Sequence, residues 1–335
     1  MKKRIVIVIG ILAVVLIAAV LLSLSWGTYQ MSISEILQTL IGNGSKVQAT
    51  TIFSLRLPRI AVAILVGIAL STAGCILQSV TKNELAEPGI IGINAGAALA
   101  VVLVIATSTT SYYSQLGDWA IYLMPFAGIF GALVAAIAIY VLSYRKGISP
   151  TRLILIGIGV NAGLNAVITL FQLTLSKGDY NQALTWISGS LWGSSWQFFW
   201  LIVPIIGIFF AWTLLESRSL DILDLGDELA TGLGIRVEAT RRKFLFFAVA
   251  LAAASTAVAG NVAFLGLLGP HLGRRLVGPV HRRLIPTAGL ISAIIILFAD
   301  TISRNLFSPI EIPVGITISI VGVPYFIYLM LKMKE

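Results

Sequence analysis

The sequence has few charged residues, and this shortage decides the class of protein. Only 11% of its 335 residues are Asp, Glu, Lys or Arg, whereas soluble domains carry roughly 25%. The hydrophobic share is 58% and the mean hydropathy is +0.96. These values exclude a water-soluble fold. Because one crossing of the ~30 Å hydrocarbon core takes about 20 apolar residues, most of the chain is available for transmembrane helices.

The sequence also has few residues that could bind a metal or catalyse a reaction. Cys75 is the only cysteine, so it has no partner for an internal disulfide, and His271 and His281 are too few for a zinc cluster. The apolar runs hold no HExxH spacing and no nucleophile beside a base, and no GxxxxGK[ST] motif provides a cradle for phosphate. We therefore expect no catalytic residue, no metal site and no cofactor, and any ATP must be hydrolysed by a partner chain.

Nine stretches lack any charged residue and are long enough to count as spans. They are residues 5–24, 60–81, 88–117, 119–144, 153–176, 182–215, 244–270, 284–299 and 312–331. The first follows Lys2, Lys3 and Arg4 and has 20 uncharged residues, which exceeds the core of a signal peptide. We expect it to be a retained first helix with its N-terminus in the cytoplasm.

The basic residues indicate ten crossings, because nine would place the arginines between 274 and 283 outside, against the positive-inside rule. A break near Gly260–Asn261 corrects the parity and places eighteen of the 23 Lys and Arg residues inside, with both termini cytoplasmic. The five outside are Lys46, Arg56, Arg59, Lys177 and Arg304. The piece after the break, 262–276, makes only about 22 Å of helix, so it must be shielded by protein. The excess of basic residues therefore reflects topology and does not indicate a nucleic-acid partner.

The fifth run carries a polar stripe. Asn161, Asn165, Thr169 and Gln172 fall at i, i+4, i+8 and i+11, which places them on one helical face. Hydrogen bonds to neighbouring helices would explain the stripe, and so would a water-filled pathway for a polar cargo. Both explanations remain open from the sequence, and these four residues are candidates for the pathway.

The second run carries small residues at every fourth position: Gly67, Ser71, Cys75 and Ser79. Such a ridge lets another helix approach closely. A position beside the pathway is the alternative, and it makes Ser71 a further pathway candidate.

The segment between the sixth and seventh runs is acidic and has an apolar edge. Residues 219–234 contain four acidic residues and no basic one, and Leu225, Leu229 and Leu233 recur at i+4 spacing. An acidic, leucine-edged element is poorly suited to an anionic membrane surface, so a protein partner is favoured over a solvated loop. The candidate contact residues are Asp224, Leu225, Gly226, Asp227, Glu228, Leu229, Ala230, Leu233 and Gly234.

Three arginines lie at or near the outer ends of the spans. Arg56, Arg59 and Arg304 place positive charge on the outer side, where an acidic protein surface could dock.

No span has a carboxylate at mid-depth, since Asp300 and Glu311 lie near outer ends. Carriers coupled to protons or sodium usually have one, so a stand-alone secondary carrier is the disfavoured alternative.

Several blocks of the sequence resemble one known family, the permease subunits of ABC importers for iron(III)-siderophores, which has haem and cobalamin permeases as relatives. The matching blocks are RLPR (56–59), AGCILQ (73–78), NELAEPGIIG (83–92), WISGS (186–190), LG to LG (225–234), FLGLLGPH (264–271), ADT (299–301) and EIPVG (311–315). They run in family order from about residue 50 to the C-terminus. One departure is Asn83-Glu84-Leu85-Ala86, where the family usually has Asn-Pro-Leu-Ala.

The resemblance implies an all-α polytopic membrane protein of the type II ABC importer permease class, with about ten transmembrane helices. Residues 1–335 would form a single transmembrane permease domain, with a cytoplasmic coupling segment at about 219–236 that docks on the ATPase. The implied partners are a second permease subunit, two cytoplasmic ATPase subunits, an extracellular substrate-binding protein that meets Arg56, Arg59 and Arg304, and the lipid bilayer. The implied cargo is a ferric siderophore, with cobalamin or haem as alternatives, and the implied location is the bacterial cytoplasmic membrane.

Overall fold

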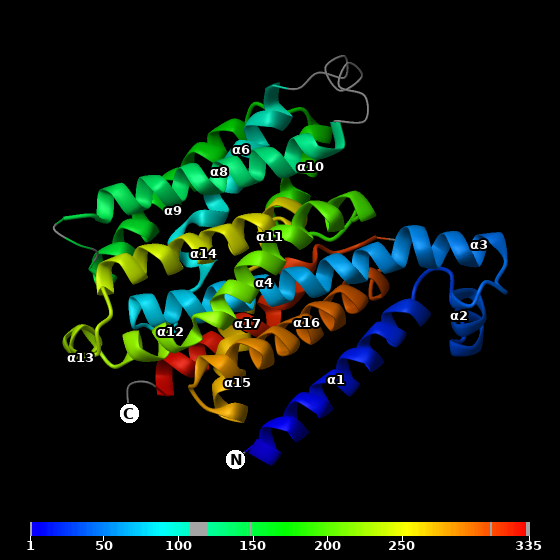
Figure 1. The fold of residues 1–335 in the computed structure, drawn as a ribbon. Helices are drawn as coiled ribbons and strands as arrows, with labels where there is room; N and C mark the ends of the chain where they lie inside the picture. The colour runs from blue at the N-terminus through cyan, green and yellow to red at the C-terminus, as the bar shows by residue number, and fades with distance from the viewer. Residues whose placement is uncertain (1, 108–119, 146, 148, 309, 333–335) are drawn as a thin grey trace.

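The fold was analysed in a computed structural model that describes residues 2–107, 120–145, 147, 149–308 and 310–332. In this part of the chain every long element is a helix, and the helices form one bundle (Figure 1). The ten that cross the bundle are α1 (Lys2–Ser25), α4 (Leu57–Thr81), α6 (Ile93–Thr107), α8 (Ala120–Ser143), α9 (Pro150–Gln172), α11 (Trp196–Leu215), α14 (Val237–Ala259), α15 (Leu265–Val277), α16 (His281–Asn305) and α17 (Val314–Lys332).

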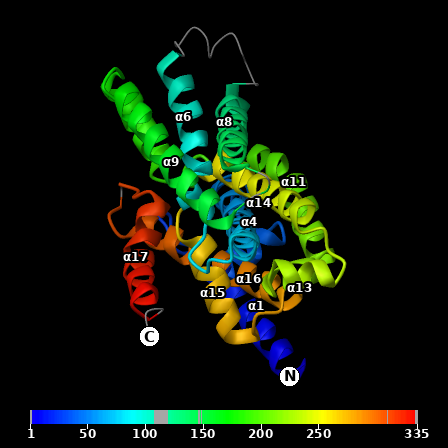
Figure 2. The same cartoon turned by 90° about the vertical axis from the view of Figure 1, so that its left-hand side faces the viewer.

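Eight of the described helices are long and apolar enough to cross a membrane, and α6 and α15 are shorter. The order and number of these helices agree with the ten expected crossings. Both chain ends lie at the same end of the bundle, as an even number of crossings requires (Figures 1 and 2). Residues 108–117 and 119 of the expected third and fourth runs lie outside the described part.

Short helices cover the two ends of the bundle. At one end, called the α10 end, lie α2 (Ile33–Leu40), α3 (Lys46–Ala49), the π-helical segment η1 (Thr50–Arg56) and α10 (Lys177–Ile187). At the other, called the α13 end, lie α12 (Ser217–Asp224), α13 (Asp227–Gly232) and both termini. A further short helix, α5 (Pro88–Ile91), directly precedes α6.

The centre of the bundle is α4, which packs against α14, α15 and α16. Its small residues permit this packing. A Cβ at Gly67 would lie 2.7 Å from the Ala293 nitrogen of α16, and one at Gly74 would lie 2.0 Å from the Gly266 oxygen of α15. Cys75 is fully buried. The packing interpretation of this ridge is therefore confirmed.

The expected break after α14 is present, and polar side chains hold it. The chain turns at Gly260 (φ 66°), and α15 begins after Phe264, whose φ of 67° is unusual for a residue with a side chain. Glu87, which is buried, accepts a hydrogen bond from the Phe264 nitrogen at 2.9 Å, and Gln78 donates to the Gly266 oxygen at 3.2 Å. The short α15 is thus shielded by protein, as its length requires.

One expected run is divided in the structure. Residues 182–215 were expected as one uninterrupted run, but α10 ends at Ile187 and α11 begins only at Trp196. The division occurs at Gly189, which has φ 78° and packs against the turn between α14 and α15. A Cβ at Gly189 would be 2.6 Å from the Asn261 oxygen. Ser195 then caps α11 by accepting a hydrogen bond from the Phe198 nitrogen. The absence of charged residues from 182–215 does not show this division, because the two helices and the loop between them are uncharged over that range.

Candidate functional site

The polar stripe of α9 lies on the surface of the described chain. Asn165 and Thr169 are exposed, and Asn161 and Gln172 are half-buried. Asn165 Nδ2 donates to Asn161 Oδ1 at 2.9 Å, and Thr169 Oγ1 donates to the Asn165 oxygen at 3.0 Å. Among the described residues, the hydrogen bonds of these side chains stay within α9. Contacts to other helices of this chain therefore do not account for the stripe.

Glycines seat α9 against the start of α6. A Cβ at Gly157 would lie 2.7 Å from the Ile91 oxygen, and a Cβ at Gly92 would lie 3.2 Å from the Asn161 Cβ. Gly92 has φ 96°, which favours glycine. This close contact includes the backbone end of Asn161 and leaves Asn165 and Thr169 of the stripe exposed.

Ser71 does not belong with the stripe. It is fully buried in α4, and a Cβ at Gly269 of α15 would lie 3.1 Å from the Ser71 Cβ. This burial supports the packing interpretation of Ser71, and its place in the pathway stays a prediction. Its small side chain serves helix packing, as its place in the ridge also allowed.

The three outer arginines come together at the α10 end. Arg56, Arg59 and Arg304 line one cavity of about 470 Å³, together with Glu311 and Trp192. They reach it from three different elements, η1, α4 and α16. The three arginines that the sequence placed on the outer side therefore lie close together, although Arg59 and Arg304 are far apart along the chain.

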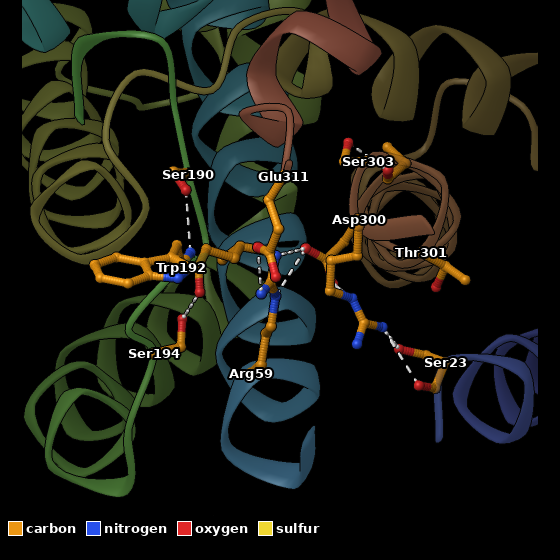
Figure 3. Close-up of polar contacts among 12 residues, drawn as sticks. Ser23, Arg59, Ser190, Trp192, Ser194, Asp300, Thr301, Ser303 and Glu311 are labelled. Carbon is orange, nitrogen blue, oxygen red and sulfur yellow. Dashed lines mark hydrogen bonds and ion pairs between the residues drawn. The ribbon is translucent and has the colours of Figure 1, made fainter. Parts of the chain in front are cut away.

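All three arginines have partners within the chain, and Figure 3 shows Arg59 between Asp300 and Glu311. Arg59 forms ion pairs with Asp300 at 2.8 Å and Glu311 at 2.9 Å. Arg304 pairs with Asp300 at 3.2 Å and donates to the Ser23 hydroxyl at 2.8 Å. Arg56 donates to backbone oxygens of Leu24 and Tyr29 and is 6% exposed. With three guanidinium groups and two carboxylates, the cluster has a net charge of +1. This net charge is smaller than the three positive charges that the arginines alone would give.

A second, larger cavity adjoins the arginine cavity. Its volume is about 800 Å³, and its wall shares Trp192, Gly193 and Glu311 with the first. Polar residues of α10, Gln182 and Thr185 among them, also line it. Two tryptophans, Trp186 and Trp192, also belong to this wall.

The acidic segment forms the two short helices α12 and α13, separated at Gly226 with φ 107°. The leucine edge is exposed: 56% of Leu225, 61% of Leu229 and 60% of Leu233 are accessible. Asp224, Glu228 and Gly234 are exposed as well, whereas Ala230 is buried. An apolar edge so exposed beside acidic groups is typical of a protein contact surface.

Asp227 has a different role from its acidic neighbours. It forms ion pairs with Lys82 at 2.6 Å and with Arg241 at 2.7 Å. Burial raises the pKa of Asp227, but the hydrogen bonds and charges of Lys82 and Arg241 outweigh it, so this pKa lies below the ordinary 3.8. Asp227 therefore stays charged and joins α13 to α4 and α14.

A second polar contact fixes α12, and sequence reasoning missed most of it. His281 is fully buried at the start of α16. Its Nδ1 lies 2.7 Å from Asp221 Oδ1, its Nε2 lies 2.8 Å from Ser79 Oγ, and its backbone nitrogen donates to Asp221 Oδ1 at 2.8 Å. His281 therefore links the start of α16 to α12 and α4.

Sequence reasoning also missed a buried amide contact beside the α14–α15 break. Asn94 Nδ2 of α6 donates to Asn261 Oδ1 at 2.7 Å, and Thr256 Oγ1 of α14 donates to Asn94 Oδ1 at 3.0 Å. Asn94 is 1% exposed. A lone asparagine inside an apolar run was the available signal, since a buried amide needs a partner.

Comparison with known proteins identifies the family. The model of the FecCD transport family matches residues 15–332. The chain is 48% identical over 326 residues to the iron(3+)-hydroxamate import system permease protein FhuG of Bacillus subtilis (strain 168), covering 97% of each chain. It is 39% identical to the Fe(3+)-citrate import system permease protein YfmE of the same organism, covering 98% of this chain and 96% of that protein.

A solved structure gives the same result. The fold matches an inward-facing conformation of a metal-chelate type ABC transporter with a TM-score of 0.85 and 29% identity, over 97% of this chain and 98% of the other. Because the family model matches almost the whole chain and both relatives are similar along their full length, the chain belongs to the FecCD transport family and is a polytopic membrane permease.

Proposed function

We propose that this chain is the permease subunit of an ABC importer in the bacterial cytoplasmic membrane and moves an iron(III)-siderophore complex through the face that carries the α9 stripe. The exposed stripe supports this proposal most directly. Polar side chains facing lipid hydrocarbon are costly, so a face with four of them is suited to water or a partner subunit. The names of FhuG and YfmE favour a ferric hydroxamate as the first cargo to test and ferric citrate as the second.

The proposal includes three protein partners. A second permease subunit faces the α9 stripe, an extracellular binding protein docks at the arginine cavity, and two ATPase subunits contact α12 and α13 from the cytoplasm. The chain itself remains non-catalytic. Both termini are then cytoplasmic, because they lie at the α13 end together with this segment.

Uptake of labelled iron in a strain that lacks this chain tests the function. The panel contains ferric hydroxamates, ferric catecholates, ferric citrate, haem and labelled cobalamin. We expect loss of uptake for one ferric class, with recovery when the chain is restored. Loss for haem or cobalamin alone would replace the cargo, and uptake that survives removal of every ATPase partner but collapses with the proton gradient would indicate a secondary carrier.

The stripe itself is tested in the restored strain. Asn165→Leu and Thr169→Val should lower uptake several-fold at unchanged protein level, because they remove polar groups from the pathway face. Val167→Leu is the matched control, since Val167 is exposed on α9 but lies off the stripe. Full uptake with both stripe variants would contradict the assignment of this face.

A further inference from the structure

An apolar cavity of about 260 Å³ lies between α8, α9 and α14. Its wall is built almost wholly from hydrocarbon side chains, including Leu133, Ala136, Leu153 and Val249. Arg242 is the one charged residue in the described wall. Neither the proposed pathway nor the docking and coupling surfaces use this cavity.

The cavity extends inward from the α13 end of the bundle. Arg242 lies near the start of α14, and Val249 is seven residues further along. On α8, which runs in the opposite direction, Tyr140 is near the C-terminal end and Leu133 is seven residues earlier. Seven residues of helix span about 10 Å. The charge therefore lies at the mouth, and only apolar groups lie at the depth of the hydrocarbon core.

Further basic groups surround the mouth. The exposed Arg145 follows α8, and Arg152 at the start of α9 donates to the Ser143 oxygen at 3.3 Å. The loop at Gly147 lies against α14, since a Cβ there would be 3.0 Å from Glu238 Oε1. Glu238 is the acidic residue of this region, and it lies 3.8 Å from Arg241. The mouth is therefore positively charged.

Arg242 differs from its neighbours in the sequence. Arg241 pairs with Asp227, and Lys243 pairs with Glu216. Arg242 is exposed and forms no ion pair with any residue that the structure describes. Its guanidinium is thus available to a group outside the chain, and the planar fork of arginine binds phosphate through two parallel hydrogen bonds.

We infer that this cavity binds an anionic phospholipid, with an acyl chain between α8 and α14 and the phosphate on Arg242. An apolar hollow does not retain water. The wall residues Ile137 and Phe246 are exposed on α8 and α14, so the cavity is also open at the side of the bundle, where an acyl chain can enter. Basic pockets between helices at the cytoplasmic face are a known way to bind anionic headgroups. The inference goes beyond the proposed function and is independent of which cargo is carried.

Native mass spectrometry of the full-length permease tests the inference. The protein is purified from nanodiscs that contain equal amounts of phosphatidylglycerol and phosphatidylcholine, and the retained lipids are counted. We expect preferential retention of phosphatidylglycerol. Arg242→Ala should lower this retention about tenfold, because charge-assisted hydrogen bonds to the phosphate are lost. Arg218→Ala is the matched control, since Arg218 is exposed on α12 away from the cavity.

The apolar part of the site is tested separately. Ala136→Phe fills the cavity and should remove the retained lipid, whereas Val134→Phe places the same bulk on an exposed part of α8 outside the cavity wall and should not. Equal retention of the two lipids by the unmodified protein, or unchanged retention in Arg242→Ala, would overturn the inference. The Arg242 comparison decides the matter if Ala136→Phe does not fold.

Discussion

At the residue scale, Arg59 forms ion pairs with two carboxylates, and its proposed docking role depends on which of them can be displaced. Its two carboxylate partners differ in burial: the side chain of Asp300 is 1% exposed and that of Glu311 is 35% exposed. Asp300 is thus a fixed part of the fold, because removing one partner of a buried ion pair leaves a charge uncompensated. If the binding protein docks here as proposed, Glu311 is the partner of Arg59 that an incoming carboxylate would replace, because it is the more exposed of the two.

We therefore predict that Glu311→Gln strengthens docking of the binding protein. The expected gain is roughly two- to fivefold in Kd, equal to ~0.5–1 kcal/mol, since an exposed competing ion pair is worth little more. The measurement is a titration of labelled binding protein onto the assembled permease at low and high salt. The low-salt difference should be larger, because salt screens exposed charges.

Asp179→Asn is the control for this comparison, as Asp179 is a half-buried carboxylate at the start of α10 that lies outside the arginine cavity. Docking that is unchanged or weaker in Glu311→Gln would contradict the displacement argument. Arg59→Glu is a less direct test, because it would place another carboxylate beside the buried Asp300.

At the element scale, α12 and α13 combine an exposed outer face with fixed inner contacts. Asp221–His281–Ser79 joins α12 to α16 and α4, and Asp227 joins α13 to α4 and α14 through Lys82 and Arg241. The contacts with α4 matter most, since this helix is the centre of the bundle. Both short helices are therefore linked by polar contacts to the centre of the bundle.

Charge reversal distinguishes the residues proposed to contact the ATPase from Asp227, which forms ion pairs within the chain. Asp224→Lys with Glu228→Lys should abolish co-purification of the ATPase and leave membrane insertion intact, because both groups lie on the short helices α12 and α13 outside the crossing helices. Asp227→Lys should lower thermal stability as well, because it places Lys82, Arg241 and a new lysine together. Co-purification undiminished in the double variant would remove the coupling role from this face.

The contact between α4 and α15 gives a second prediction at this scale. Gly74→Ala should destabilise the permease by about 1–3 kcal/mol, because its Cβ would lie 2.0 Å from a backbone oxygen that cannot rotate away. Gly207→Ala on α11 has open space around it and should be neutral or stabilising by up to ~1 kcal/mol. Thermal unfolding in detergent measures both, and equal melting temperatures would contradict the packing described here.

At the scale of the whole molecule, α9 and α17 both have exposed faces, and the polar stripe makes the face of α9 poorly suited to lipid. The two helices lie on the same side of the bundle (Figure 2). Most of α9 is uncovered, with only 17% of its most apolar window buried. A second permease subunit placed against this side would enclose the polar stripe between two chains.

Cysteine cross-linking tests this arrangement. The one native thiol, Cys75, is buried, so Thr169→Cys should form a disulfide-linked dimer on mild oxidation if the partner is a second copy. Trp212→Cys, on the exposed side of α11, should stay monomeric. With a different permease as partner, the cross-link requires a cysteine on that chain. Failure of every stripe position against both partners would contradict the proposed pathway.

Several features of the candidate site could not be predicted from the sequence. Arg59 pairs with residues 241 and 252 positions away, and no local pattern shows that such residues meet. Ser71 and Ser79 occupy equivalent positions in one ridge, yet one packs against α15 and the other binds His281. Their difference depends on which helix lies opposite.

The sequence by itself determined the crossings of this protein, the break at Gly260–Asn261, the acidic segment with its leucine edge and the face of the polar stripe. These features follow from hydropathy, charge and helical period, which are properties of consecutive residues. Only the tertiary structure decided which charges neutralise one another, where α10 separates from α11, and that Arg242 stands at the mouth of an apolar cavity. Each of these depends on contacts between distant segments, and the packing of the helices around α4 sets those contacts.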